Sequence, residues 1–234
     1  LMDKEKADMV FTDPPYNVDY GSLNKGLHDS ARIKRRGTSK HHYYEDKKTF
    51  EEYKAFTNSF IQNAKKLTKE NGSFYIWFPD KWMDILLSEL RNNELPFGVF
   101  IVWLKSKFVI TWRRYHPKHE LCVFAGIPAS ATSKATKDTW FGSKKEVSIW
   151  EVNNDKNKDY QHPTQKPVEL GIRAIKNSSK RNDIVLDLFG GSGSTLIACE
   201  KLNRKCYMME IDPHYCDVII KRWEQYTNNK AVKI

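Results

Sequence analysis

The sequence contains few cysteines and no long hydrophobic run. Its four cysteines include no C-x-x-C pair, so we expect no zinc site or disulfide framework, but buried free thiols in a reducing compartment. His116 and His119 lack a nearby cysteine or acidic cluster at metal-ligand spacing, and no metal is expected. No apolar stretch approaches the roughly 20 residues that span a bilayer, and the first residues do not resemble a signal peptide. These absences favour a globular cytoplasmic protein.

Basic residues outnumber acidic residues by 39 to 29, which gives a net charge of +10. This excess favours a polyanionic partner such as nucleic acid. A chain of 234 residues suffices for one α/β core, so we expect a single domain over residues 1–234. Residues 1–8 have the character of a helix end, which indicates a domain excised from a longer chain with an upstream strand missing.

A short stretch after the apolar run Met9-Val10-Phe11 has the residue types that hold a planar ring with an exocyclic amine. Asp13 can accept a hydrogen bond, and two consecutive prolines lack N–H donors, so backbone carbonyls are left as acceptors. Tyr16 offers a ring face for stacking. The carboxyl end of a strand is also where open α/β sheets bind ligands. Taken alone, a proline-rich turn with a capping aspartate explains these residues at least as well.

A long basic stretch follows this motif. Residues 17–48 contain three glycines and few aliphatic side chains, so we expect a long loop. Such a loop can close over a nucleic-acid strand, although a solvated run of charges has the same composition. The nucleic-acid contacts expected here are Asn17, Arg32, Arg35, Arg36 and Lys40.

The middle of the chain alternates between helix and strand patterns. Apolar residues recur at spacings of three and four before an Asn71-Gly72 pair, which is typical of a helix and its C-terminal stop. The expected elements are a helix over 49–70, a strand over 73–78, a helix over 80–93, and strands over 97–103 and 120–125. This order predicts an α/β fold with a mostly parallel twisted sheet, helices on both faces and an antiparallel edge hairpin.

Residues 105–161 first interleave basic and aromatic side chains and then loosen into small polar ones. Lys105, Arg113 and Arg114 are expected to contact phosphates, while aromatic neighbours can stack on bases or cover a strand edge. From residue 126 onward we expect an extended surface segment with Trp150 as an isolated anchor. A helix is expected over 168–177.

A glycine-rich turn follows the apolar strand expected over 183–189, before a helix over 196–202. Glycines at such a turn let a ligand approach the backbone closely, although a turn can also need small residues for packing alone. Glu210, at the end of the next strand, is placed to hydrogen-bond a ribose, which favours an adenosine cofactor. Leu196 occupies the position where a dinucleotide fingerprint has its third glycine. Asp187 would repel a pyrophosphate but attract the ammonium or sulfonium end of S-adenosylmethionine. The closing residues 231–234 are a candidate edge strand.

The Asp13-Pro14-Pro15-Tyr16 motif and the later Asp187-x-Phe189-Gly190-Gly191-Ser192-Gly193 motif resemble those of amino-methylating DNA methyltransferases, in their permuted group. The resemblance covers nearly all of the chain and implies a Rossmann-like methyltransferase fold. It implies a catalytic role for Asp13, Pro14, Pro15 and Tyr16. It also implies that Asp187, Phe189, Gly190, Gly191 and Gly193 wrap the methionine part of the cofactor, that Glu210 holds its ribose, and that His162, Thr164 and Lys166 contact its carboxylate end.

An aspartate in the first motif position is more typical of the adenine enzymes in this family. We therefore expect methyl transfer from S-adenosylmethionine to N6 of an adenine flipped out of duplex DNA, in a bacterial or phage restriction-modification setting. Transfer to cytosine N4, an RNA substrate, a catalytically silent nucleic-acid-binding module and a nicotinamide-dependent oxidoreductase are the alternatives. The sequence does not define the oligomeric state, and a homodimer is one possibility.

Overall fold

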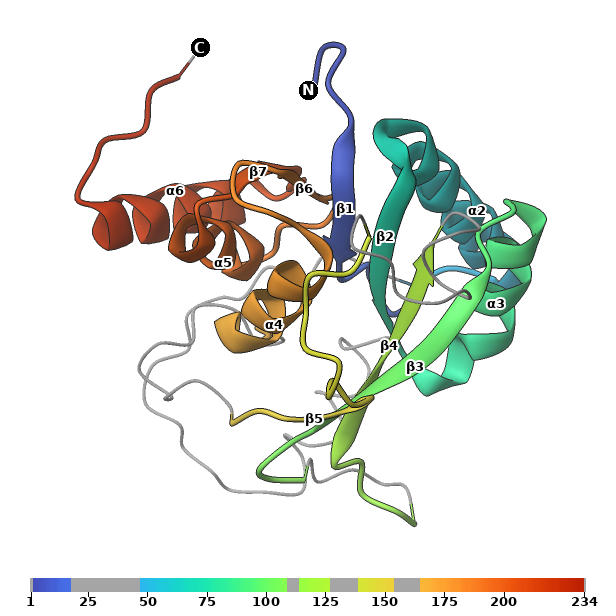
Figure 1. The fold of residues 1–234 in the computed structure, drawn as a ribbon. Helices are drawn as coiled ribbons and strands as arrows, with labels where there is room; N and C mark the ends of the chain where they lie inside the picture. Colours follow the sequence, from blue (N-terminus) through green and yellow to red (C-terminus); the bar gives the residue numbers. More distant parts are fainter. Residues whose placement is uncertain (1, 18–46, 109–113, 127–138, 154–164, 234) are drawn as a thin grey trace, which may run out of the picture.

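The computed structural model describes residues 2–17, 47–108, 114–126, 139–153 and 165–233. These residues form a seven-stranded sheet in the order β5-β3-β4-β2-β1-β6-β7, with helices packed on both sides (Figure 1). The predicted α/β class is confirmed. Seven predicted site residues lie outside the described part of the chain: Arg32, Arg35, Arg36, Lys40, Arg113, His162 and Thr164.

Four neighbouring strands are parallel. They are β2 (Thr68–Phe78), β1 (Ala7–Thr12), β6 (Ile184–Asp187) and β7 (Lys205–Met208). Successive side chains of a strand point to opposite faces of the sheet. In β1, Val10 packs into one core cluster, whereas Met9 and Phe11 pack into the other. Both faces are therefore buried, which explains why β1 reads as a continuous apolar run.

An antiparallel hairpin extends the sheet beyond β2. β3 (Phe97–Leu104) pairs with β4 (His119–Gly126), and β4 inserts between β3 and β2, antiparallel to both. The short β5 (Ile149–Glu151) pairs in parallel with β3 and ends the sheet on that side. The predicted hairpin is therefore present, with its second strand inside the sheet.

The helices form a layer on each face of the sheet. α2 (Phe50–Leu67) and α3 (Met83–Asn92) cover one face, and α4 (Val168–Ser178) and α5 (Ser194–Leu202) cover the other (Figure 1). The short helix η1 (Asp80–Trp82) leads into α3, and α6 (Pro213–Thr227) follows β7. None of the described helices is long and apolar enough to cross a membrane.

Two predictions near the starts of β1 and β2 are wrong. Residues 2–6 form no helix, and β1 begins at Ala7. α2 ends at Leu67 and does not continue to the Asn71-Gly72 pair, because Thr68 is already in an extended conformation and starts β2. Gly72 lies within β2 beside a register shift, where a Cβ atom would stand 2.2 Å from the Thr68 side chain. This glycine therefore serves an irregular strand and does not stop a helix.

The segment after β4 was predicted to lie on the surface, but part of it is buried. Trp150 lies in β5 and is only 2% exposed. Its ring packs against Tyr75 at a centroid distance of 6.3 Å, and the Arg173 guanidinium lies 5.0 Å from its centroid. A strand of three residues gives too short a pattern to predict.

The C-terminal region also differs from the prediction. α6 was not among the expected elements, although Asp212 caps it by accepting a hydrogen bond from His214 N at 2.8 Å. Residues 231–233 form no edge strand. Ala231 N donates instead to Glu224 Oε1 at 3.0 Å, which ties this part of the chain to the end of α6.

The parallel strands all end at the same edge of the sheet, hereafter the carboxyl edge. Asp13 follows β1, the glycine turn follows β6, and Glu210 follows β7. Because β4 is antiparallel to β2, its first residues, including Glu120, lie at this edge as well. The fold therefore brings both sequence motifs to the place where open α/β sheets bind ligands.

Candidate active site

Thr12 links the two sequence motifs at the carboxyl edge. Its hydroxyl donates to Asp187 Oδ1 at 2.9 Å and accepts from Leu188 N at 3.2 Å. Thr12 is buried at the end of β1, and both partners lie at the end of the neighbouring β6. The first motif and the glycine turn are therefore fixed relative to one another by side-chain bonds as well as by strand pairing.

Asp13 presents one occupied and one unoccupied carboxylate oxygen. Oδ2 pairs with the ammonium of Lys166. Oδ1 is buried and has no hydrogen-bond partner among the described residues. Burial raises the pKa of this carboxyl, and the charge of Lys166 opposes that shift. A buried acceptor without a donor is costly, so Oδ1 is suited to receive a donor from a ligand.

Lys166 lies at the first motif and belongs to a network of four charges. Its ammonium contacts Asp13, Tyr16 OH at 3.0 Å and Glu120 Oε2 at 3.2 Å. Glu120 Oε1 also pairs with Lys105 Nζ at 2.5 Å. Burial alone would raise the pKa of Glu120, but the two lysines hold it below its ordinary value. The sequence assigned Lys166 to the cofactor carboxylate, and the structure places it beside Asp13.

The glycine turn after β6 is shaped by backbone bonds. Gly190 N donates to Met209 O at 2.7 Å, and Gly193 N donates to Gly190 O at 2.8 Å. Gly191 and Gly193 have φ angles of 53° and 79°, which favour glycine. A Cβ atom on Gly191 would meet nothing within 4 Å, whereas Gly191 N is held by Glu210 Oε2 at 2.7 Å. The turn therefore leaves open space beside Gly191, next to Glu210, the residue predicted to hold the ribose.

Asp187 and Phe189 have internal partners. The Asp187 oxygens accept from Thr12, from Phe189 N at 3.1 Å and from Thr195 Oγ1 at 2.6 Å. Burial raises the pKa of Asp187 to about 7, against the opposing effect of the Thr195 hydrogen bond. The Phe189 ring packs against Phe60 of α2. Asp187 therefore joins β1, the turn and α5.

The described residues that were predicted to contact nucleic acid differ in their surroundings. Asn17 is buried, and its side chain donates to Lys48 O at 3.0 Å and accepts from Lys48 N at 2.6 Å. It thereby fixes the two ends of the 17–48 segment together beside the first motif. Lys105 is paired with Glu120, and Arg114 lines a cavity of about 430 Å³ before β4.

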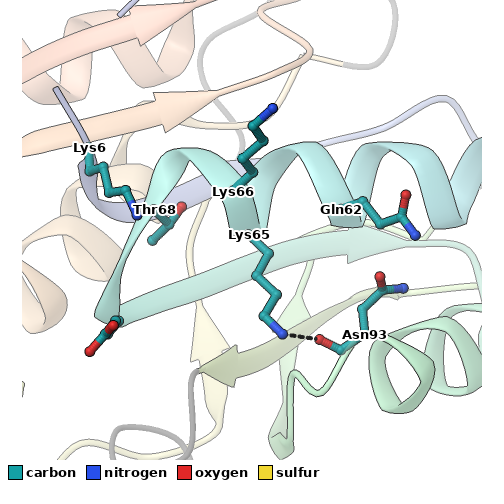
Figure 2. Close-up of a pocket in the computed structure, with 7 residues that line it drawn as sticks. Lys6, Gln62, Lys65, Lys66, Thr68 and Asn93 are labelled. Carbon is teal, nitrogen blue, oxygen red and sulfur yellow. Dashed lines mark hydrogen bonds between the residues drawn. The ribbon is translucent and has the colours of Figure 1, made fainter. Parts of the chain in front are cut away.

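A cavity of about 510 Å³ lies away from the carboxyl edge, where α2 ends and β2 begins (Figure 2). Its lining consists of Lys6, Gln62, Lys65, Lys66, Thr68, Glu70 and Asn93. Lys65 Nζ donates to Asn93 O at 2.7 Å, so this lysine is already engaged by the protein. The cavity contains none of the predicted site residues. Among the described residues, no group of three or more His, Cys, Asp or Glu side chains is arranged to hold a metal ion.

Sequence reasoning gave no role to three residues that shape the site. Glu120 could have been found from the expected hairpin, because an acid at the start of an antiparallel strand faces the carboxyl edge of its parallel neighbours. Thr195 follows the glycine turn and bonds Asp187. Arg222 lies on α6, which was not predicted, so no sequence pattern indicated its contact with the turn.

A doubly wound sheet with a glycine turn and an acid after adjacent strands defines the class of Rossmann-like enzymes that bind a nucleotide cofactor at the carboxyl edge. Within this class the chain belongs to the N6/N4 DNA methylase family, whose model matches residues 7–222. It is thus a DNA methyltransferase by family, which agrees with the resemblance of its two motifs.

The relatives of the chain are bacterial methyltransferases. Type II methyltransferase M.HpaI of Haemophilus parainfluenzae is 26% identical and aligns with 97% of this chain and 71% of its own length. Type II methyltransferase M2.DpnII of Streptococcus pneumoniae is 27% identical over 95% of this chain and 84% of its own length.

Two solved structures show the same fold. A complex of M1.HpyAVI with SAM superposes with a TM-score of 0.64 at 24% identity, covering 94% of this chain and 90% of that one. The cytosine-N4-specific PvuII DNA methyltransferase superposes with a TM-score of 0.69 at 16% identity, covering 97% and 86%. The predicted methyltransferase fold is therefore confirmed.

Proposed function

We propose that this protein methylates N6 of adenine in duplex DNA, with S-adenosylmethionine as the methyl donor and the target base flipped out of the helix. The main support is Asp13 Oδ1, a buried acceptor without a partner in the described structure, within the Asp-Pro-Pro-Tyr motif. An exocyclic amine supplies the N–H donor that this atom lacks. Flipping is part of the proposal because the amine of a stacked, paired base cannot enter such a site.

The first motif can activate an amine that is otherwise a poor nucleophile, because its lone pair is conjugated with the ring. Hydrogen bonds to Asp13 Oδ1 and to the Pro14 carbonyl would draw the nitrogen toward tetrahedral geometry and free the lone pair. Tyr16 would stack on the base. When bound, S-adenosylmethionine would supply an electrophilic methyl carbon. As the amine lone pair bonds to this carbon, the carbon–sulfur bond would break and leave its electrons on sulfur. Asp13 is also an acceptor for the N–H proton that the nitrogen must then lose.

The residues of the glycine turn fit the proposed cofactor. We place its methionine part beside Gly191, where the structure has open space, and its ribose near Glu210. Asp187, Phe189, Gly190 and Gly193 hold the backbone of the turn in the shape that this requires. Glu210 also accepts from Asp212 N at 2.9 Å, which fixes its position before a ligand arrives.

Arg222→Met is expected to weaken cofactor binding several-fold, because Arg222 Nη1 donates to Ser192 O at 2.9 Å and to the Ser192 and Ser194 hydroxyls. A hydrogen bond to a charged group contributes about 1.5–3 kcal/mol to stability. Part of this free energy stabilises the conformation of the glycine turn. Calorimetric titration with S-adenosylmethionine measures the change. Lys221→Met, on the exposed neighbouring position of α6, is the matched control. Equal affinity in the two variants would show that Arg222 does not support the cofactor site.

Methyl transfer to unmethylated DNA, followed by nucleoside analysis of the product, tests the proposed base. We expect N6-methyladenine, because the first motif position is Asp13. N4-methylcytosine would retain the amine chemistry and overturn the adenine assignment. A product formed only on RNA would overturn the proposed duplex DNA substrate.

The proposed DNA path follows the carboxyl edge. Arg114 lines the cavity before β4, and Asn17 anchors the basic segment 17–48 beside the first motif. The net charge of +10 favours binding to phosphates. Since the relatives named above are bacterial, we place this activity in a bacterial cytoplasm, on DNA that a restriction-modification system protects.

A further inference from the structure

The Lys166 ammonium is held between the first motif and β4. Its ammonium donates hydrogen bonds to Asp13 Oδ2 and Tyr16 OH and forms an ion pair with Glu120 Oε2 at 3.2 Å. The side chain is only 8% exposed, and its Nζ lies 5.0 Å from the Trp77 ring centroid. Burial lowers the pKa of Lys166, but the Asp13 and Glu120 charges more than offset this effect, so the lysine stays charged. The ammonium is therefore a buried cation held by three neighbouring groups.

The backbone of Lys166 is joined to the other half of the site. Its carbonyl accepts from Ser194 Oγ at 2.8 Å, at the first residue of α5 after the glycine turn. One residue therefore contacts the proposed base site through its side chain and the proposed cofactor site through its backbone. In-line transfer depends on the alignment of these two sites, and small displacements are costly.

We propose that Lys166 is a positioning residue: it holds Asp13 Oδ2 and Tyr16 OH so that Asp13 Oδ1 faces the target amine in line with the cofactor turn. The proposal rests on the proposed methyl transfer to an exocyclic amine, whether of adenine or cytosine. It differs from the role that the sequence assigned to this lysine, a contact with the carboxylate end of the cofactor. Glu120 assists through its ion pair with the lysine.

The ionisation of Asp13 provides a readout of this arrangement. The groups that shift the pKa of its carboxyl are Lys166 before α4, Glu120 on β4 and Tyr16 after β1. Asp13 in turn raises the pKa of Cys122 on β4 and of Asp187 at the end of β6, so these groups are also close enough to interact with it. Lys166 lowers the pKa of Asp13, whereas Glu120 raises it. Removing each charge should therefore move the titration of Asp13 in opposite directions. A protonated Asp13 carries an O–H donor and is a weaker acceptor for the amine, so the acid limb of the rate profile follows the same titration.

The test compares Lys166→Met, Lys166→Arg and Glu120→Gln with the intact protein. Carboxyl ¹³C NMR monitors the titration of Asp13. In Lys166→Met we expect both this titration and the acid limb of the kcat profile to move to higher pH. In Glu120→Gln both should move to lower pH. At neutral pH, kcat of Lys166→Met should fall about 100-fold, with partial recovery in Lys166→Arg, which keeps the charge. The dissociation constant of S-adenosylmethionine should change by about twofold or less. Lys176→Met, at an exposed position on α4, is the control.

Two results would overturn the proposal. One is an unchanged Asp13 titration in Lys166→Met, which would show that the ion pair does not act on the catalytic carboxyl. The other is at least about tenfold weaker cofactor binding with normal kcat at saturation, which would return Lys166 to the cofactor site. The NMR titration needs no turnover. A protein that transfers no methyl group at all would therefore contradict the proposed function, while the titration still decides the role of Lys166.

Discussion

Asp13→Ala is expected to lower the rate of methyl transfer by about 10²–10³-fold or more, and to leave cofactor affinity almost unchanged. The substitution removes Oδ1, the buried acceptor without a partner, which we assign to the target amine. It does not strip Lys166 of all its partners, since Glu120 and Tyr16 remain within hydrogen-bond distance. In the described structure the glycine turn is held by bonds that do not involve the Asp13 carboxylate, so it should keep its shape.

Single-turnover transfer on unmethylated DNA and calorimetric titration with S-adenosylmethionine separate the two effects. Asp84→Ala, at an exposed position of α3, is a control for the loss of one acid. Asp13→Asn should be nearly as inactive as Asp13→Ala. Its amide oxygen would face the Lys166 ammonium, and its NH₂ group would then point a donor at the donating amine. Normal turnover in both variants would move the catalytic site away from Asp13.

The meeting of the two motifs could be predicted from the sequence. Parallel strands carry their following residues to one edge, so an acid after β1, a glycine turn after β6 and an acid after β7 had to lie on the same side of the sheet. The apolar run of β1 already indicated a strand buried on both faces. The order of these strands in space, however, follows only from their pairing.

The charge network could not be predicted, because it depends on the position of β4 within the sheet. Lys166 and Asp13 are 153 residues apart, and no local pattern indicates their ion pair. Glu120 reaches the same place only because β4 inserts between β3 and β2 and runs antiparallel to β2. Sequence motifs therefore gave the candidate ligand-binding groups, whereas the residues that set the charge of those groups required the tertiary structure.

The two left-handed glycines of the turn should respond differently to the same substitution. Both have positive φ, so alanine at either position costs about 1–2 kcal/mol of folding stability through backbone strain. At Gly193 a Cβ atom would also lie 3.2 Å from Ile219 Cγ1, so Gly193→Ala should destabilise the protein further by disturbing α6. Gly191→Ala meets no protein atom within 4 Å and should lose stability through strain alone.

Cofactor binding should distinguish the two glycines further. The methyl group of Gly191→Ala enters the open space in which we place the methionine part of S-adenosylmethionine. Overpacking of about 1–3 kcal/mol there corresponds to a dissociation constant roughly five- to 150-fold higher. Urea unfolding without ligand and calorimetric titration measure the two effects on each variant. If Gly191→Ala bound the cofactor as tightly as the intact protein, the ligand would not lie against Gly191, and the glycine would serve only the backbone turn. If it lost affinity while Gly193→Ala lost more stability, one glycine would be required by the cofactor and the other by the packing of α6.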